Sequence, residues 1–125
     1  MTIIEAINRV DSLIPNNYSQ EVKINWLSIL DGIIKNEIID THEGASGVVF
    51  NKYTDDTALD TVLLAPFPYD DIYVYFLESR IHYSNEEYDE YNNAVTMYNA
   101  MFTDFANYYN KTHIPNRGSN KRFIF

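Results

Sequence analysis

The chain of 125 residues contains no cysteine, four glycines, four prolines and few basic residues. The lack of cysteine excludes disulfide frameworks, thiolate zinc sites and cysteine nucleophiles. Nine lysines and arginines against 18 aspartates and glutamates give a net charge of −9 at pH 7. This balance excludes a general nucleic-acid binder, because such a protein needs cations to neutralise phosphates. At 46% hydrophobic residues the chain is also too apolar for a disordered tail, and its length suits one domain.

Long hydrophobic runs are absent as well. The longest uninterrupted apolar run, Ile72 to Leu77, is far shorter than the roughly 20 residues of a membrane-spanning helix. The first residues, Met1 to Glu5, lack the basic start and long apolar run that are typical of a signal peptide. We therefore expect a protein that is made in the cytosol and has no membrane partner.

Aromatic residues make up 15% of the chain, and apolar residues recur at helical spacing in four segments. The spacing predicts an all-α fold with four main helices at about 2–14, 20–41, 69–83 and 85–111. The second of these carries two adjacent apolar rows, which predicts a wide buried face and a central position. Ser19 is the expected N-cap of the second helix, and Ser84 with Glu87 has the capping-box spacing at the start of the fourth.

The strongest pattern is an aromatic row in the fourth helix, whose members follow one another in alternate steps of three and four residues. They are Tyr88, Tyr91, Val95, Tyr98, Phe102, Phe105 and Tyr109. Because a tyrosine hydroxyl needs water or a partner, we expect this row at an edge or an interface.

Two parts of the chain lack this periodicity. Residues 43–69 are expected to form a long irregular arm in which Val48–Phe50 is a candidate short strand, and both a functional arm and a plain insertion fit its length. Residues 116–125 are expected to form an extended C-terminal tail on a helical domain of residues 1–115.

No pattern in the sequence indicates catalysis. His42, His82 and His113 do not form a metal-binding motif such as HExxH, and the acidic run 86–90 is typical of a solvated helix face. The chain has neither a glycine-rich phosphate loop nor a nucleophile elbow. We assign no enzyme activity, no metal and no cofactor.

Short runs spread across the chain carry a family resemblance. They are Glu5–Ile7, Arg9–Asp11, Pro15–Asn16, Trp26–Ser28, Leu30–Gly32, Glu37–Ile39, Thr41–Gly44, Leu63–Pro66, Pro68–Asp71, Glu87–Tyr88, Tyr91–Asn93, Phe105, Tyr108–His113 and Pro115. In this order and spacing, up to about Pro115, the chain resembles the head–tail connector proteins, or adaptors, of tailed bacteriophages and prophages of Gram-positive bacteria. Arg117 to Phe125 matches least.

The resemblance implies an all-α structural protein of the virion neck that forms a ring of about twelve copies below the portal. The implied partners are the portal protein, a stopper or tail-completion protein, further copies of the chain, and DNA that passes through the lumen without sequence-specific binding. Because each copy carries a net charge of −9, we expect the isolated chain to be largely monomeric and the ring to form on the portal.

Two groups of residues are candidates for these contacts. The first would line the lumen or rim, because an acidic wall repels phosphate and lets DNA slide; its members are Asp55, Asp56, Asp60, Glu86, Glu87 and Glu90. The second would dock on the portal; its members are Arg117, Lys121, Arg122, Phe123, Ile124 and Phe125. The alternatives are an ordinary solvated acidic surface for the first group and an apolar end folded back onto the chain's own helices for the second.

Two other classes of protein remain as alternative interpretations of the sequence. A small acidic inhibitor, such as an immunity protein or a DNA mimic, also needs helices and negative charge, but it would bind one basic target one-to-one. A metal hydrolase would retain a metal after purification.

Overall fold

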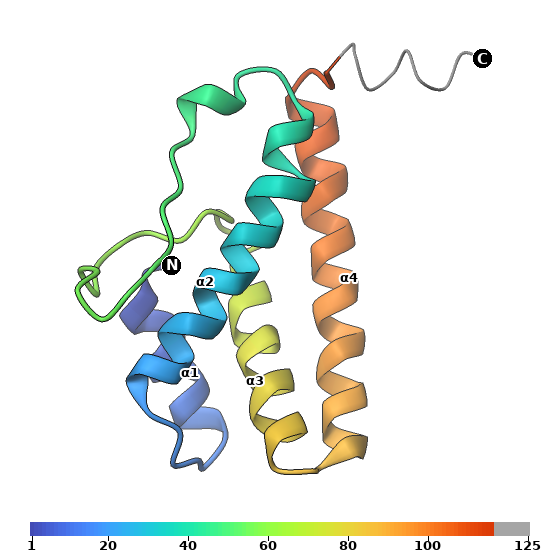
Figure 1. Cartoon of the computed structure of the whole chain (residues 1–125). Helices are drawn as coiled ribbons and strands as arrows, with labels where there is room; N and C mark the ends of the chain where they lie inside the picture. Colours follow the sequence, from blue (N-terminus) through green and yellow to red (C-terminus); the bar gives the residue numbers. More distant parts are fainter. Residues whose placement is uncertain (117–125) are drawn as a thin grey trace.

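A computed structural model describes residues 1–116, and this part of the chain is all-α, with four α-helices and no β-strand (Figure 1). The helices are α1 (Ile3–Leu13), α2 (Gln20–Glu37), α3 (Ile72–Ser84) and α4 (Tyr88–Thr112), with short 3-10 turns at Ile39–Thr41 and Ala45–Gly47. The fold class predicted from the sequence is confirmed. None of the helices in residues 1–116 has both the length and the apolar character that a bilayer crossing requires.

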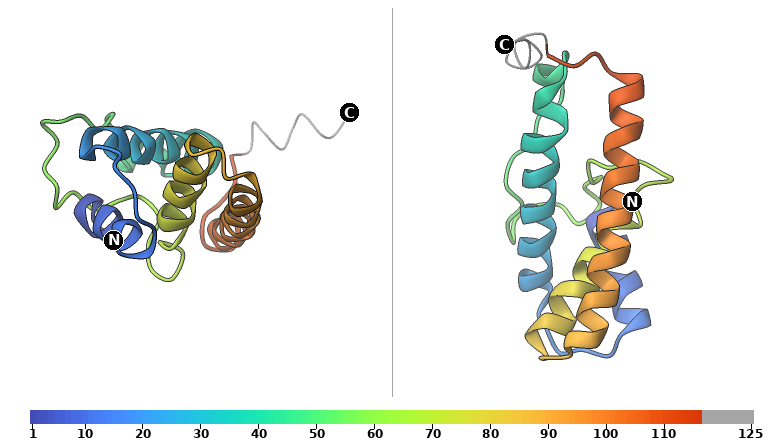
Figure 2. Two further views of the ribbon diagram at one scale, coloured as in Figure 1. Left: turned by 90° about the horizontal axis from the view of Figure 1, so that it is seen from below. Right: turned by 90° about the vertical axis from the view of Figure 1, so that its right-hand side faces the viewer.

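The central helix is α3, not α2 as the apolar rows predicted. α3 packs against α1, α2 and α4, and Figure 2 shows it between α1 and α4 when the bundle is viewed from below. Its residues Ile72, Tyr73, Val74, Phe76, Leu77, Ser79 and Ile81 are buried. On α2, by contrast, one of the two predicted apolar rows contains Val22 and Ile29, which are exposed. Only the other row fully faces the core; its members are Leu27, Leu30, Ile34 and Ile38.

The N-terminal caps follow local sequence rules. The Ser19 hydroxyl accepts a hydrogen bond from the Val22 amide, as predicted for the start of α2. At the start of α1, Thr2 and Glu5 form a capping box: the Glu5 amide donates to Thr2 Oγ1 at 3.2 Å, and the Thr2 amide donates to Glu5 Oε1 at 3.1 Å.

The predicted capping box at the start of α4 is wrong. Ser84 is the last residue of α3, and Glu87, which precedes α4, makes no side-chain cap. Glu86 turns the chain with a left-handed φ of 59°. The Glu87 carboxylate instead lies 3.0 Å from His82 Nδ1 and accepts a bond from Asn85, so it joins the end of α3.

The aromatic row of α4 changes its environment along the helix. Tyr88 is 54% exposed, the members from Tyr91 to Phe102 are half-buried, and Phe105 and Tyr109 are buried. The expected edge position is therefore correct for the first part of the row and wrong for the last part.

The arm of residues 43–69 contains no strand, so the expectation for Val48–Phe50 is wrong. Isolated bridges pair Thr2 with Val62 and His42 with Pro115. The amides of Ile3 and Ile4 donate to the carbonyls of Thr61 and Leu59, so the arm runs along the beginning of α1. The third helix starts at Ile72, later than predicted, because turn hydrogen bonds such as Tyr69 N to Pro66 O occupy the preceding residues.

Candidate functional site

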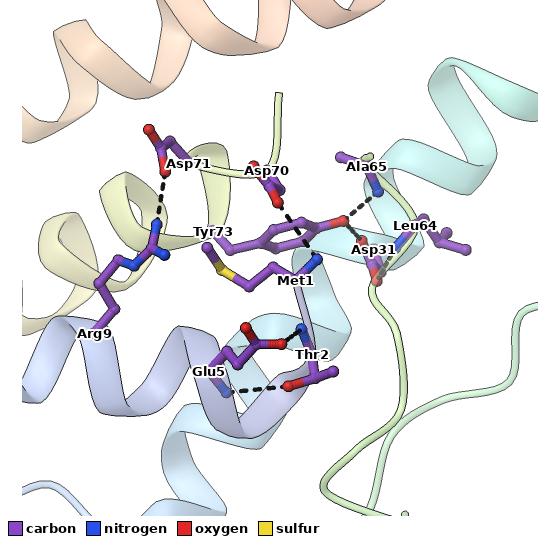
Figure 3. A network of polar contacts seen from close by, with 10 residues as sticks. All are labelled: Met1, Thr2, Glu5, Arg9, Asp31, Leu64, Ala65, Asp70, Asp71 and Tyr73. Carbon is purple, nitrogen blue, oxygen red and sulfur yellow. Dashed lines mark hydrogen bonds and ion pairs between the residues drawn. The ribbon is translucent and has the colours of Figure 1, made fainter. Parts of the chain in front are cut away.

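A buried carboxylate on α2 joins the arm to the helices (Figure 3). Asp31 is fully buried, and its Oδ1 accepts a hydrogen bond from the Tyr73 hydroxyl of α3 at 2.6 Å. Its Oδ2 accepts from the Tyr53 hydroxyl at 2.6 Å and from the Leu64 amide at 3.1 Å. The Tyr73 hydroxyl also accepts a bond from the Ala65 amide at 2.6 Å. Asp31 therefore binds the arm at two places and α3 at one, and Tyr73 binds the arm at a third place, Ala65.

The titration of this cluster is governed by burial. Burial raises the pKa of Asp31 above its usual value, although the hydrogen bonds from Tyr53, Tyr73 and Leu64 act in the opposite direction. Burial and the neighbouring Asp31 charge also raise the pKa values of Tyr53 and Tyr73. Both phenols therefore remain protonated donors at neutral pH.

The predictions from the sequence give no role to Asp31, although the sequence contains a signal for it. Asp31 continues the apolar row of Ile24, Leu27 and Ile34 in steps of three and four, so an acid stands on a buried helix face. A buried carboxylate requires hydrogen-bond donors, and the nearest candidates in the chain were not identifiable without the tertiary structure.

Two charge pairs join the residues just before α3 to Met1 and to the middle of α1 (Figure 3). The amino group of Met1 lies 3.4 Å from Asp70 Oδ2, and Arg9 Nη1 donates to Asp71 Oδ1 at 3.0 Å. Arg9 and Asp71 are half exposed, so their pair contributes little to stability. These contacts position the start of α3 relative to α1.

The structure separates the six predicted acidic residues into two groups, although all six are exposed. Asp55, Asp56 and Asp60 lie on the arm, where Asp55 and Asp56 line a pocket together with the first turns of α2. Glu86, Glu87 and Glu90 lie at the α3–α4 turn and the start of α4, at the lower end of the bundle (Figure 1). Within one copy the six residues therefore do not form one surface.

A groove with a volume of about 220 Å³ lies between α3 and α4, next to the second acidic group. We call it the α3–α4 groove; Tyr75, Glu78 and His82 line it from α3, and Glu90, Ala94 and Met97 line it from α4. Burial raises the pKa of Glu78, while the nearby His82 acts to lower it. Met97 is 47% exposed and Tyr75 is half-buried, so the groove offers apolar surface beside two carboxylates.

The last described residues, up to Asn116, are held by contacts at the C-terminal end of α4, away from the α3–α4 turn. The His42 ring is buried, with Nδ1 2.6 Å from Ile38 O and Nε2 2.7 Å from Asn110 Oδ1. The Asn116 amide donates to Thr41 O at 2.9 Å, and the Tyr109 and His113 rings stack at 3.7 Å. The chain therefore leaves the described structure from a fixed position where α2 and α4 end.

The six residues predicted to dock on the portal, Arg117 and Lys121 to Phe125, lie outside the described residues. Of the three histidines, His82 contacts Glu87, not the Glu86 four residues further along the chain. Within residues 1–116, no three histidine, aspartate or glutamate side chains converge in a way that could hold a metal ion.

Comparison with known protein families, with curated proteins and with solved structures finds no match for this chain.

Proposed function

We propose that this chain is a structural adaptor of a tailed-phage neck, which forms a ring below the portal and surrounds the channel for DNA. The proposal rests on the ordered runs that resemble the head–tail connector family from Glu5 to Pro115. The all-α fold of residues 1–116 agrees with the fold that this resemblance implies.

The two-ended layout of the molecule is the structural observation that supports the proposal best. The acidic α3–α4 turn lies at one end of α4, and Asn116 is held at the other end by Thr41 (Figure 1). At 1.5 Å per residue, α4 separates these ends by roughly 37 Å. A subunit of a stacked neck must contact one component above and another below, and surfaces at opposite ends of a long helix suit that task.

Negative charge also agrees with a channel function. The α3–α4 turn presents exposed Glu86, Glu87, Asp89 and Glu90. In a ring, copies of such a turn would repel the phosphates of DNA and leave the duplex free to slide.

Electron microscopy of purified portal rings mixed with this protein tests the proposal. We expect a second ring, made of copies of this chain and with cyclic symmetry, to stack on the portal ring. No added density, or a one-to-one complex with a basic protein in place of a ring, would contradict it, and the second result would support an acidic inhibitor.

A further inference from the structure

The α3–α4 groove has the chemistry of a docking site for a short cationic segment with an apolar end. Glu78 and Glu90 lie on its two helices, and the half-buried Tyr75 ring and the exposed Met97 supply apolar surface beside them. Exposed Glu86 and Glu87 extend the negative charge beyond the groove toward the α3–α4 turn. The titratable groups of the groove are thus two carboxylates, the Tyr75 phenol, and His82, whose Nδ1 lies 3.0 Å from the Glu87 carboxylate.

The chain itself contains a segment of complementary composition. Residues 117–125 carry Arg117, Lys121 and Arg122 and then the run Phe123–Phe125, with no acidic residue. We propose that this segment of one copy docks in the α3–α4 groove of a second copy. The cations lie beside Glu78 and Glu90, and the apolar run covers Tyr75 and Met97.

Chain length favours a second copy over the same copy. Glu90 lies 22 residues before Thr112 on α4, which corresponds to roughly 33 Å of helix. Arg122 is six residues beyond Asn116, and six extended residues span at most about 21 Å. In the same copy, the backbone of Arg122 therefore stays well short of Glu90, whereas the tail of a neighbouring copy has no such limit.

This contact joins two different surfaces, a tail and a groove, so each copy can give one contact and receive another. Such head-to-tail contacts close into rings when the rotation between copies allows it and otherwise form filaments. The contact needs neither the portal nor DNA, so it stands or falls independently of the proposed function. At high local concentration the pairing of opposite charges offsets the repulsion between copies of net charge −9.

Photo-cross-linking of the full-length chain tests the contact. Phe123→benzoylphenylalanine is introduced, and isotope-labelled and unlabelled copies are mixed at high protein concentration before illumination. We expect cross-linked peptides that join position 123 to residues 88–100, including pairs of mixed label. Cross-links confined to same-label pairs would show docking within one copy and overturn the proposal, as would the absence of cross-links to α4.

Charge exchange provides the matched control. Glu78→Lys with Glu90→Lys, or Lys121→Glu with Arg122→Glu, should each lower the cross-link yield about tenfold, and mixing the two variants should restore it between unlike copies. Asp55→Lys with Asp56→Lys changes charge equally on the arm loop and should leave the yield unchanged. If the groove variant fails to fold by circular dichroism, the tail variant alone still decides, because an undiminished yield would overturn the proposal.

Discussion

Removal of the Tyr73 hydroxyl tests whether the buried Asp31 cluster holds the arm in place. This hydroxyl donates to Asp31 Oδ1 and accepts from the Ala65 amide, both at 2.6 Å, so Tyr73→Phe removes the partner of two buried atoms. A hydrogen bond to a charged group contributes about 1.5–3 kcal/mol, and a stranded buried amide costs about 1 kcal/mol or more. We therefore expect the free energy of unfolding to fall by about 3 kcal/mol.

The matched variant is Tyr53→Phe, which removes one bond to the same carboxylate. Its hydroxyl donates to Asp31 Oδ2 at 2.6 Å, but that oxygen keeps the Leu64 amide at 3.1 Å. No backbone amide loses a partner, so the expected loss is about 1.5 kcal/mol. The difference between the two variants isolates the cost of stranding Asp31 Oδ1 and the Ala65 amide.

Urea unfolding followed by circular dichroism at neutral pH measures both losses from the midpoints at constant slope. Amide hydrogen exchange adds a local readout, because Leu64 and Ala65 should exchange faster in Tyr73→Phe. Tyr83→Phe serves as the control, since Tyr83 is 53% exposed and surface changes usually alter stability by less than about 0.5 kcal/mol. Equal losses in Tyr73→Phe and Tyr53→Phe, or a larger loss in Tyr53→Phe, would refute the reasoning.

Three further outcomes are expected in urea unfolding. Burial raises the folded-state pKa of Asp31. The contribution of Asp31 to stability is therefore greatest below its unfolded-state pKa of about 4 and is lost as the pH rises through the folded-state pKa. The Asp31→Asn variant should lack this decline, and parallel pH profiles of stability for the two proteins would contradict the expectation. Asp11→Ala leaves the buried Lys23 ammonium without the carboxylate 2.7 Å away and should cost about 2 kcal/mol, below the 3–5 kcal/mol typical of fully buried pairs because Asp11 is 43% exposed. Phe105→Ala should cost about 3–5 kcal/mol because Phe105 is fully buried, whereas Tyr88→Ala should cost under about 1 kcal/mol; similar costs would mean that the aromatic row is not graded along α4.

The aromatic row of α4 shows what the sequence pattern could predict and what it could not. Its steps of three and four residues predicted the helix and the shared face, because both follow from the helical period. They did not predict that Tyr88 is exposed and Phe105 buried, since burial depends on which other elements cover the helix. At the buried part, Tyr69 of the arm contacts Phe105 and His42 contacts Tyr109, and both contacts join segments that are distant in the chain.

At the α3–α4 turn, a local sequence pattern gave a wrong prediction. Ser84 and Glu87 have the spacing of a capping box, yet Ser84 extends α3 and Glu87 contacts His82 and Asn85. Local patterns fail where two helices meet, because the same residues can end one helix or begin the next. The six acidic residues were predicted to share one function, but the fold places the group at residues 55–60 and the group at residues 86–90 at two separate sites on the surface.

The sequence by itself determined the all-α class, the approximate position of four helices and the cap at Ser19, because apolar period and caps act over one or two helical turns. Only the tertiary structure decided that α3 is central and that the arm is fixed to Asp31. The hydroxyls that reach Asp31 come from residues 22 and 42 positions away in the chain. Contacts at such separations depend on how the helices pack, and a single sequence does not state that arrangement.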